Sequence, residues 1–207
     1  IDIPEGKNLV GAFKQPKLVL CDTGALKSLP HDFLVDGMGE VVKYGMIKSD
    51  ELFGILMNHD INTVHEVMDD IIARCVAIKR DVVEADEFDK GERMLLNFGH
   101  TLGHSIEQYY HYTGISHGRA VAKGMEIITD LAEKRGMCRK GLTADLCGCL
   151  KKYELTRDIE PTPAQLGSAC MNDKKRDGSS IHVIICSDIG KSSAVKMSVA
   201  DFNDFLA

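Results

Sequence analysis

Apolar residues recur along most of the chain at the three- and four-residue spacing of an amphipathic helix. The clearest run covers residues 63–85, where apolar side chains lie at 64, 67, 68, 71, 72, 75, 76, 78 and 82. Thr63 and Glu66 have the spacing of a capping box at its start. Similar spacing predicts further helices over 25–29, over 31–57 with a candidate break at 36–37, over 95–110, from 117 or 118 to 135, over 142–153, and after Pro163.

Two parts of the chain have the β-branched and apolar composition of strands. KLVLC at 17–21, between Pro16 and Asp22, predicts a short buried strand. Near the other end, SIHVIICSDIG and KSSAVKMSV predict a hairpin that turns at Gly190. The pattern therefore predicts a mainly α fold with a few short strands.

Length and charge narrow the class of protein. The chain has 207 residues, 44% of them hydrophobic, which suits one large domain, or one and a half ordinary ones, with a sizeable core. Its net charge of −6 argues against nucleic acid or an anionic membrane as a partner. No apolar run is long enough to span a bilayer, and the seven cysteines lack a CxxC pair, so we expect free thiols in a reducing cytoplasm. Because the chain opens with Ile1 rather than Met, we expect it to be part of a longer polypeptide.

Four of the eight histidines lie within residues 95–125. His100 and His104 are four residues apart and project from one face of a helix, and His117 opens the next predicted helix. Three imidazoles so close could form a catalytic zinc site with an open position, or include ordinary core and surface histidines. The spacing does not decide between His100 and His104 as a ligand. The adjacent glutamate of an HExxH metalloprotease motif is absent.

Charged residues near these histidines suggest an anion pocket beside a metal. Glu40 and Lys43 lie three residues apart on one face of an apolar predicted helix. They could form a simple ion pair within that helix, or they could be part of a functional site. Arg93 and Asn97 lead into His100 at helical spacing and would extend one polar ridge. Lys79 lies among valines on another predicted helix, where a lone lysine usually extends to solvent.

Several segments at these positions resemble the 3-dehydroquinate synthase family, in order and over roughly residues 5 to 190. They are GKNLVGAFKQPKLVLCDTGALKSLP, GMGEVVKYGMI, DEFDKGERMLLNFGHTLGHSIE, HGRAVAKGM and the DKK motif. The resemblance implies an N-terminal Rossmann-like domain that binds NAD, followed by a multihelical C-terminal domain that carries a metal. It divides this chain into residues 1–24, the tail of the NAD-binding domain, and residues 25–207, the helical metal- and substrate-binding domain. The Rossmann-like domain itself is absent from these residues.

The resemblance also assigns roles by motif position. It implies a zinc or cobalt ion held by Glu40, His100 and His117, with His104 as an acid/base residue beside it. The positions implied to contact substrate are Lys43, Lys79, Asp89, Arg93, Asn97 and Lys174. The positions implied to contact NAD are Lys7, Asn8, Ala25, Leu26, Lys27 and Ser28.

The activity implied is conversion of 3-deoxy-D-arabino-heptulosonate 7-phosphate, a sugar-acid phosphate, to 3-dehydroquinate and phosphate in the shikimate pathway. NAD acts catalytically there, and we expect a homodimer as the full-length enzyme and an inactive chain without the N-terminal domain. The alternatives are another sugar-phosphate cyclase of the superfamily or a stand-alone metal-binding module. The sequence departs from the family at Gly39 (usually Ala), Arg119 (usually Glu) and Phe33 (commonly polar).

Overall fold

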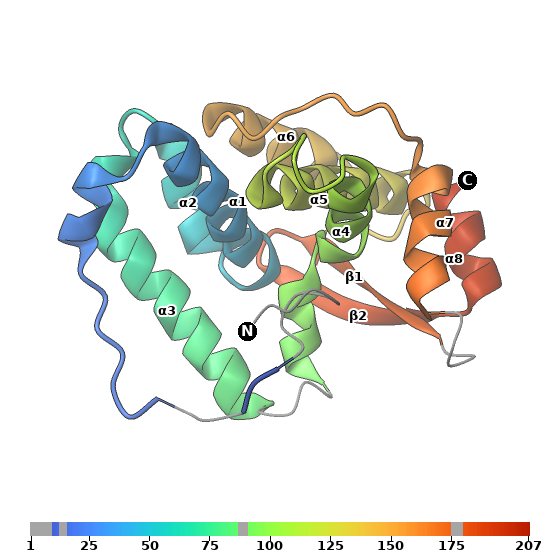
Figure 1. Cartoon of the computed structure of the whole chain (residues 1–207), viewed down its shortest axis with the longest axis horizontal. Helices are drawn as coiled ribbons and strands as arrows, with labels where there is room; N and C mark the ends of the chain where they lie inside the picture. Colours follow the sequence, from blue (N-terminus) through green and yellow to red (C-terminus); the bar gives the residue numbers. More distant parts are fainter. Residues whose placement is uncertain (1–9, 13–15, 87–90, 175–179) are drawn as a thin grey trace.

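Helices make up most of the fold, with one antiparallel β-hairpin near the C-terminal end (Figure 1). The computed structural model describes residues 10–12, 16–86, 91–174 and 180–207, without the side chains of 169 and 171–174. Its elements are η1 (Thr23–Ser28), α1 (His31–Lys48), α2 (Asp50–Asn58), η2 (Val64–Val67), α3 (Met68–Ala85), η3 (Glu92–Asn97), α4 (His100–Tyr109), α5 (His117–Lys134), α6 (Leu142–Lys152), α7 (Pro163–Lys174), β1 (Ile181–Asp188), β2 (Lys191–Met197) and α8 (Val199–Leu206). The mainly α class and the hairpin are confirmed. No helix in these ranges is long and apolar enough to cross a membrane.

Helix α1 lies at the centre of the packing. It contacts α2, α3, α5, α6 and both strands, and Figure 1 shows it surrounded on most sides. Val35, Val42 and Met46 are therefore fully buried, which explains the nearly continuous apolar sequence of this helix. Lys43 is buried among them, with only 3% of its surface exposed. A charge enclosed in this way requires a partner.

Glycines allow α5 to touch the backbones of both α1 and α4. A Cβ on Gly118 would lie 1.9 Å from the carbonyl oxygen of Asp36, and one on Gly39 would lie 2.7 Å from the oxygen of Gly118. At the other contact, a Cβ on Gly124 would lie 2.1 Å from the oxygen of Gly99. These distances are shorter than any non-bonded carbon–oxygen contact, so larger side chains would separate the helices.

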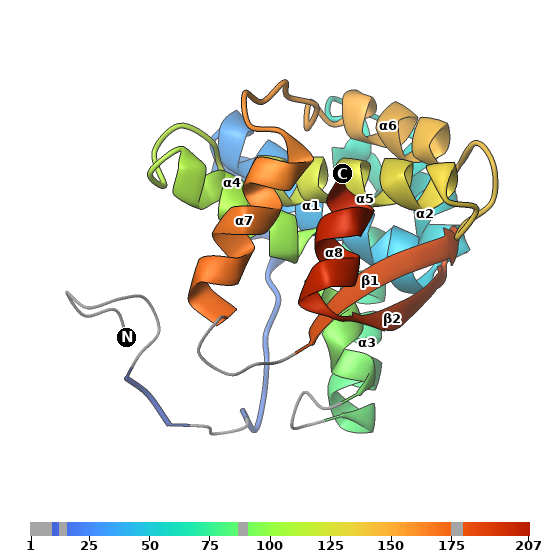
Figure 2. The same cartoon turned by 90° about the vertical axis from the view of Figure 1, so that its right-hand side faces the viewer.

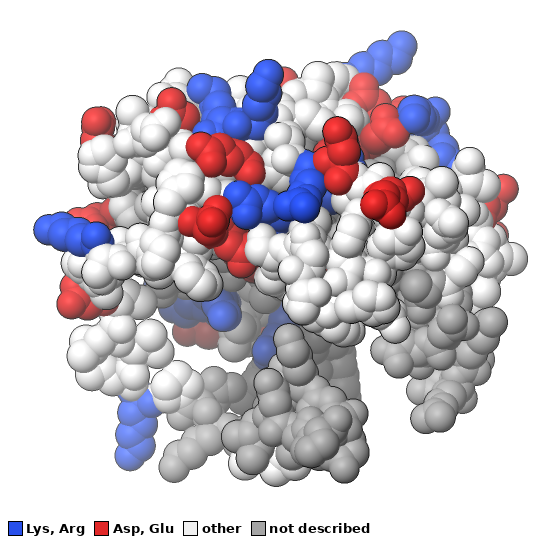
Figure 3. All heavy atoms as spheres, turned by 45° about the horizontal axis from the view of Figure 1, so that its top comes forward, with Lys and Arg blue, Asp and Glu red and all other residues white. Residues whose placement is uncertain are grey.

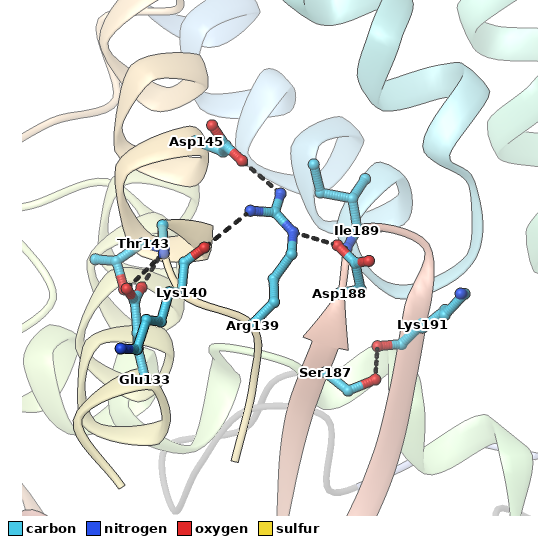
Figure 4. Close-up of polar contacts among 10 residues, drawn as sticks. Glu133, Arg139, Lys140, Thr143, Asp145, Ser187, Asp188, Ile189 and Lys191 are labelled. Carbon is cyan, nitrogen blue, oxygen red and sulfur yellow. Dashed lines mark hydrogen bonds and ion pairs between the residues drawn. The ribbon is translucent and has the colours of Figure 1, made fainter. Parts of the chain in front are cut away.

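The hairpin is held against the helices by hydrogen bonds at its turn (Figure 4). The Gly190 N–H donates to the Met46 carbonyl at the end of α1, at 3.0 Å. Arg139, in the loop between α5 and α6, donates through Nε to Asp188 at 2.5 Å and through Nη2 to Asp145. The β1–β2 turn is thus tied to both α1 and the start of α6.

A C-terminal helix, α8, was not predicted. Ser198 caps it in a full capping box, because its hydroxyl accepts from the Asp201 N–H while the Asp201 carboxylate accepts from the Ser198 N–H. Phe202 and Phe205 are buried, and α8 packs against α7 and β2 (Figure 2). The sequence signal was present, but the segment is only eight residues long and follows a strand directly.

The helix predicted over 31–57 is two helices, and the predicted break at Asp36 and Gly37 is wrong. Helix α1 continues through both residues and ends at Lys48. Ser49 then begins α2, because its hydroxyl accepts from the Leu52 N–H at 3.1 Å.

Two other predicted helix boundaries are also wrong. The capping box at 63–66 does not form, since the Thr63 hydroxyl is bonded to Asp60, and one 3₁₀ turn, η2, precedes α3. The helix predicted over 95–110 is divided into η3 and α4 by Gly99, whose φ of +77° cannot continue a right-handed helix. Arg93 and Asn97 therefore do not continue the face of α4 that carries His100. The helices predicted from 117, over 142–153 and after Pro163 are confirmed as α5, α6 and α7.

The strand predicted over 17–21 does not form in this structure. These residues pair with no strand among the described residues, and Leu18 and Leu20 are 74% and 84% exposed. A single segment cannot satisfy the hydrogen bonds of a strand without a neighbour.

Gly124→Ala tests whether the close helix contact limits stability. We expect the free energy of unfolding to fall by about 1–3 kcal/mol, because the methyl group meets the Gly99 backbone and the helices must move apart. Gly148→Ala is the matched control: it lies within α6, where an added Cβ meets no atom within 4 Å. That change should raise the same free energy by about 0.4–1 kcal/mol. Urea denaturation measures both free energies of unfolding. Equal changes in the two variants would show that the contact between Gly124 and Gly99 does not limit stability.

Candidate metal and substrate site

Three side chains predicted as metal ligands meet where α1, α4 and α5 converge. Glu40 comes from α1, and His100 and His117 are the first residues of α4 and α5. Glu40 Oε1 lies 3.3 Å from His100 Nε2 and 3.9 Å from His117 Nε2. Their three ligand atoms lie within 4.8 Å of one another, and we call Glu40, His100 and His117 the metal group. The close glycine contacts described above bring these helices together at this point.

Both imidazoles are oriented by a hydrogen bond on the nitrogen opposite Glu40. His100 Nδ1 lies 3.1 Å from the carbonyl oxygen of Phe98, and His117 Nδ1 lies 3.2 Å from Glu107 Oε1. Because both partners are acceptors, we assign the proton of each neutral ring to Nδ1. Each Nε2 then presents its lone pair toward Glu40. Metal-binding histidines are usually oriented in this way.

The arrangement leaves an unbonded buried oxygen between the two rings. Glu40 Oε1 is buried and forms no hydrogen bond with any described residue, and it faces two nitrogen lone pairs. Lone pairs in such proximity repel one another unless a proton or a cation lies among them. A divalent cation would satisfy all three atoms, and a carboxylate with two imidazoles is a known donor set for catalytic zinc. The residues present therefore fit a metal ion.

Lys43 neutralises the other oxygen of the same carboxylate. Its Nζ lies 2.5 Å from Glu40 Oε2, so the predicted ion pair forms, and it leaves Oε1 facing the two imidazoles. Burial lowers the pKa of Lys43, and the neighbouring Glu40 carboxylate opposes that shift. The ammonium also lies 5.3 Å from the centre of the Tyr44 ring.

The pKa of Glu40 is the outcome of opposing effects. Burial of the carboxylate raises the pKa. The contacts with the His100 imidazole and the Lys43 ammonium lower the pKa by more than burial raises it, and the result is a pKa of about 2. The carboxylate is therefore the form that the surrounding charges stabilise.

His104 lies beside the metal group, one turn after His100. Its ring centre is 5.6 Å from that of His100 and 6.1 Å from that of His117, and its side chain is exposed. An exposed imidazole next to a metal group can reach a molecule held there. This position suits a proton-transfer residue, as the motif implies.

The predicted anion-binding residues come from two further elements. Lys79, on α3, is exposed and close enough to Lys43 to lower the pKa of Lys43 by repulsion. Arg93 and Asn97 lie on η3, which packs against both α1 and α3. The Arg93 N–H donates to the Asp86 carboxylate at 3.1 Å. Of these positive charges, Lys79 on α3 thus lies near Lys43 on α1, beside Glu40.

Charge of both signs is scattered over the face of the molecule drawn in Figure 3. Figure 3 shows lysines and arginines interspersed with aspartates and glutamates over the face that it presents. A local anion site would therefore depend on a few residues rather than on a broad basic surface.

The residues predicted to contact NAD are only partly described. Ala25, Leu26, Lys27 and Ser28 form η1, which packs against α3 and is capped by Asp22 at the Gly24 N–H. Phe33 follows on α1 and is 64% exposed. Lys7, Asn8 and Asp89 lie outside the described residues. Lys174 ends α7, and its side chain is likewise outside what the structure describes.

Two residues that hold His117 were missed in the sequence. Glu107 bonds its Nδ1, and Asp36 accepts from the Gly118 N–H at 2.6 Å, which fixes the first turn of α5. Glu107 lies three residues after His104 and Asp36 lies four before Glu40, so helical spacing placed each on the right face. Nothing in the sequence showed that either would reach α5. Arg119, where the family usually has glutamate, contacts Asp32 and the carbonyl oxygen of Glu154.

Comparisons with known proteins find relatives over nearly the whole chain. The family model for the 3-dehydroquinate synthase C-terminal region matches residues 37–176, and the N-terminal model matches residues 1–36. The 3-dehydroquinate synthase of Clostridium perfringens strain 13 is 45% identical over 98% of the chain. That of Streptococcus thermophilus strain LMD-9 is 40% identical over 100%. The chain spans 58% and 59% of the lengths of these relatives.

Solved structures show a similar fold. A 2-epi-5-epi-valiolone synthase from Streptomyces hygroscopicus subsp. jinggangensis, with NAD+ and Zn2+ bound, superposes with a TM-score of 0.84 at 24% identity. A 2-deoxy-scyllo-inosose synthase, complexed with carbaglucose-6-phosphate, NAD+ and Co2+, has a TM-score of 0.81 at 24% identity. Each match covers 100% of this chain and 59% of the other. Together with the family models, these matches confirm the C-terminal domain of the dehydroquinate synthase-like fold.

The lowered pKa of Glu40 predicts a pH-dependent contribution to stability in the metal-free chain. Because its pKa in the folded chain, about 2, is below the ordinary 4.5, the unfolded state binds more protons between these values. The contribution is present above about pH 4.5 and is lost as the pH falls toward 2. We expect Glu40→Gln to make urea-unfolding free energy less pH-dependent in that window. The exposed Glu66→Gln is the control, and equal slopes in all three proteins would contradict the prediction.

Proposed function

The chain belongs to the 3-dehydroquinate synthase family, and from that premise we propose that it is the metal- and substrate-binding part of such an enzyme. The reaction would convert 3-deoxy-D-arabino-heptulosonate 7-phosphate to 3-dehydroquinate and phosphate, in the shikimate pathway and in the cytoplasm. The observation that best supports a catalytic metal here is the buried, unbonded Glu40 Oε1 between two oriented imidazoles.

In this proposal Glu40, His100 and His117 hold the ion, zinc or cobalt. A bound ion would act as a Lewis acid on a hydroxyl or carbonyl oxygen of the substrate. Phe98 and Glu107 hold the two imidazoles with Nε2 toward the ion, so the site is formed before substrate arrives. Lys43 balances the charge of Glu40 and leaves one carboxylate oxygen for the metal.

The remaining residues bind the substrate and move its protons. Arg93 and Asn97 on η3 and Lys79 on α3 suit the carboxylate and phosphate groups, since guanidinium binds both with two parallel hydrogen bonds. Lys43, Asp89 and Lys174 complete the proposed substrate contacts. A ring nitrogen of His104 would exchange a proton with a substrate oxygen held next to the metal group, because imidazole titrates near neutral pH.

The proposal extends to the parts of the enzyme beside this domain. Residues 1–24 would be the tail of the NAD-binding domain, with Lys7, Asn8 and the η1 residues Ala25, Leu26, Lys27 and Ser28 near NAD. NAD supplies the hydride chemistry, and the full-length enzyme would form a homodimer.

Identity separates the proposed activity from the alternatives. Curated 3-dehydroquinate synthases are 40–45% identical to this chain, whereas the valiolone and inosose synthases are 24% identical and support only the fold. This difference favours the dehydroquinate activity over another sugar-phosphate cyclase. The oriented metal group similarly favours an enzyme over a stand-alone binding module.

The metal assignment predicts which alanine variants lose the ion. Glu40→Ala, His100→Ala and His117→Ala should each lose bound zinc after dialysis against a weak chelator, because each removes one of three protein ligands. His104→Ala is the matched control, one turn from His100, and should keep it. Metal analysis by atomic absorption measures both. Loss in His104→Ala with retention in His100→Ala would show that the two histidines were assigned in reverse.

The proposed reaction is tested with the chain alone and with a chimaera. Residues 1–207 supplied with NAD, zinc and the heptulosonate phosphate should release no phosphate, because most contacts to NAD are expected in a preceding domain. A chimaera in which the N-terminal part of the Clostridium perfringens relative precedes residue 1 should release it and form dehydroquinate. His104→Ala in that chimaera should keep its metal and turn over ~10²–10⁴-fold more slowly. Full activity of residues 1–207, or of the His104 variant, would contradict these roles.

A further inference from the structure

A second set of metal-ligand side chains lies on the other side of His117. His104, Glu107 and His117 offer ligand atoms that lie within 4.8 Å of one another. This set shares only His117 with the group that contains Glu40 and His100. His104 and Glu107 are three residues apart on α4, so the same helix face directs both toward His117.

The two nitrogens of His117 serve these two groups separately. They point in different directions from the ring, Nε2 toward Glu40 Oε1 at 3.9 Å and Nδ1 toward Glu107 Oε1 at 3.2 Å. Two donors on one tetrahedral zinc lie roughly 3.3 Å apart, given zinc–nitrogen bonds of about 2.0–2.1 Å. The Nδ1 and Glu107 atoms already have this spacing. An ion could therefore replace the proton that they share.

We propose that the chain binds a second divalent transition-metal ion through His104, Glu107 and Nδ1 of His117, and that this ion inhibits the site. Two imidazoles and one carboxylate form a zinc-type donor set. Binding would release the Nδ1 proton to solvent and leave His117 as an imidazolate that bridges both ions. The proposal rests on the proposed function, since His117 is there a ligand of the first ion.

The second ion should bind more weakly than the first and act when metal is in excess. It must replace the hydrogen bond between His117 and Glu107, whereas the first ion meets a buried oxygen that has none. His104 is also exposed, so water competes for its side of the site. An ion on His104 would occupy the nitrogen proposed to transfer protons, and excess metal would thereby block turnover.

Calorimetric titration of residues 1–207 with Zn2+ tests the proposal without an activity assay. The wild-type chain should bind two ions in two phases. Glu107→Gln should bind one, because the amide oxygen still accepts the Nδ1 hydrogen bond of His117 but is a poor zinc ligand. His104→Ala should likewise lose only the second phase. Glu66→Gln, an exposed change in η2, should keep both.

A parallel titration with Co2+ identifies the donors, because thiolate ligands would give charge-transfer bands and the proposed set would not. Three results would overturn the second site. The wild-type chain could bind one ion only, both Glu107→Gln and His104→Ala could still bind two, or the second phase could show thiolate bands. Binding of no ion by the wild-type chain would overturn the first site as well, so the two failures are distinct. If circular dichroism shows that Glu107→Gln is unfolded, His104→Ala decides the outcome.

Discussion

Direct backbone contact between α5 and its two neighbours is the constraint on which the site depends. Gly118 meets the Asp36 carbonyl on α1, and Gly124 meets the Gly99 carbonyl before α4, at separations that exclude any side chain. His117 and Glu40 each adjoin a glycine of the first contact, and His100 follows Gly99 in the second. Moving α5 away by the width of a methyl group would therefore separate His117 from Glu40 and from His100. The helices pack for stability, but the same contacts fix the geometry of the donors.

Burial of charge in α1 follows from this close packing. Lys43 is almost fully enclosed, and its partner is the Glu40 carboxylate on the same helix. Compared with two apolar residues, a buried pair of this kind contributes little net stability, because desolvation offsets most of the attraction, although protonating Glu40 alone would leave Lys43 buried without a countercharge. Its effect is instead on chemistry: Lys43 binds one oxygen of Glu40, keeps the carboxylate ionised and leaves the other oxygen toward the imidazoles. We infer that the pair is retained for the site rather than for the fold.

The sequence predicted the elements of the site better than the contacts between them. The spacing of His100 and His104 was enough to place two imidazoles on one helix face, because it depends only on helical periodicity, whereas the approach of His117 across the loop was left open. The choice of His100 over His104 required the family motif, since both lie on one face of α4. Glu107 and Asp36 were missed because their roles depend on how α1, α4 and α5 cross, which no local pattern encodes. The division at Gly99 was missed for a related reason: its close approach to α5, which leaves no room for a side chain, depends on the packing of two helices.

The two histidines proposed as metal ligands share a further property, which bears on the charge of the substrate that the site could bind. Each is the first residue of its helix, so the positive ends of α4 and α5 converge beside Glu40. A helix N-terminus is equivalent to about half a positive charge, so two of them offset roughly one carboxylate. Glu40 is already balanced by Lys43. With the proposed divalent ion added, the Glu107 carboxylate beside His117 offsets one of its two charges and the site retains a net positive charge, which Lys79 near Lys43 increases. Such a site favours a substrate with several negative charges, and a sugar-acid phosphate, with its carboxylate and phosphate, meets that requirement without a broad basic surface.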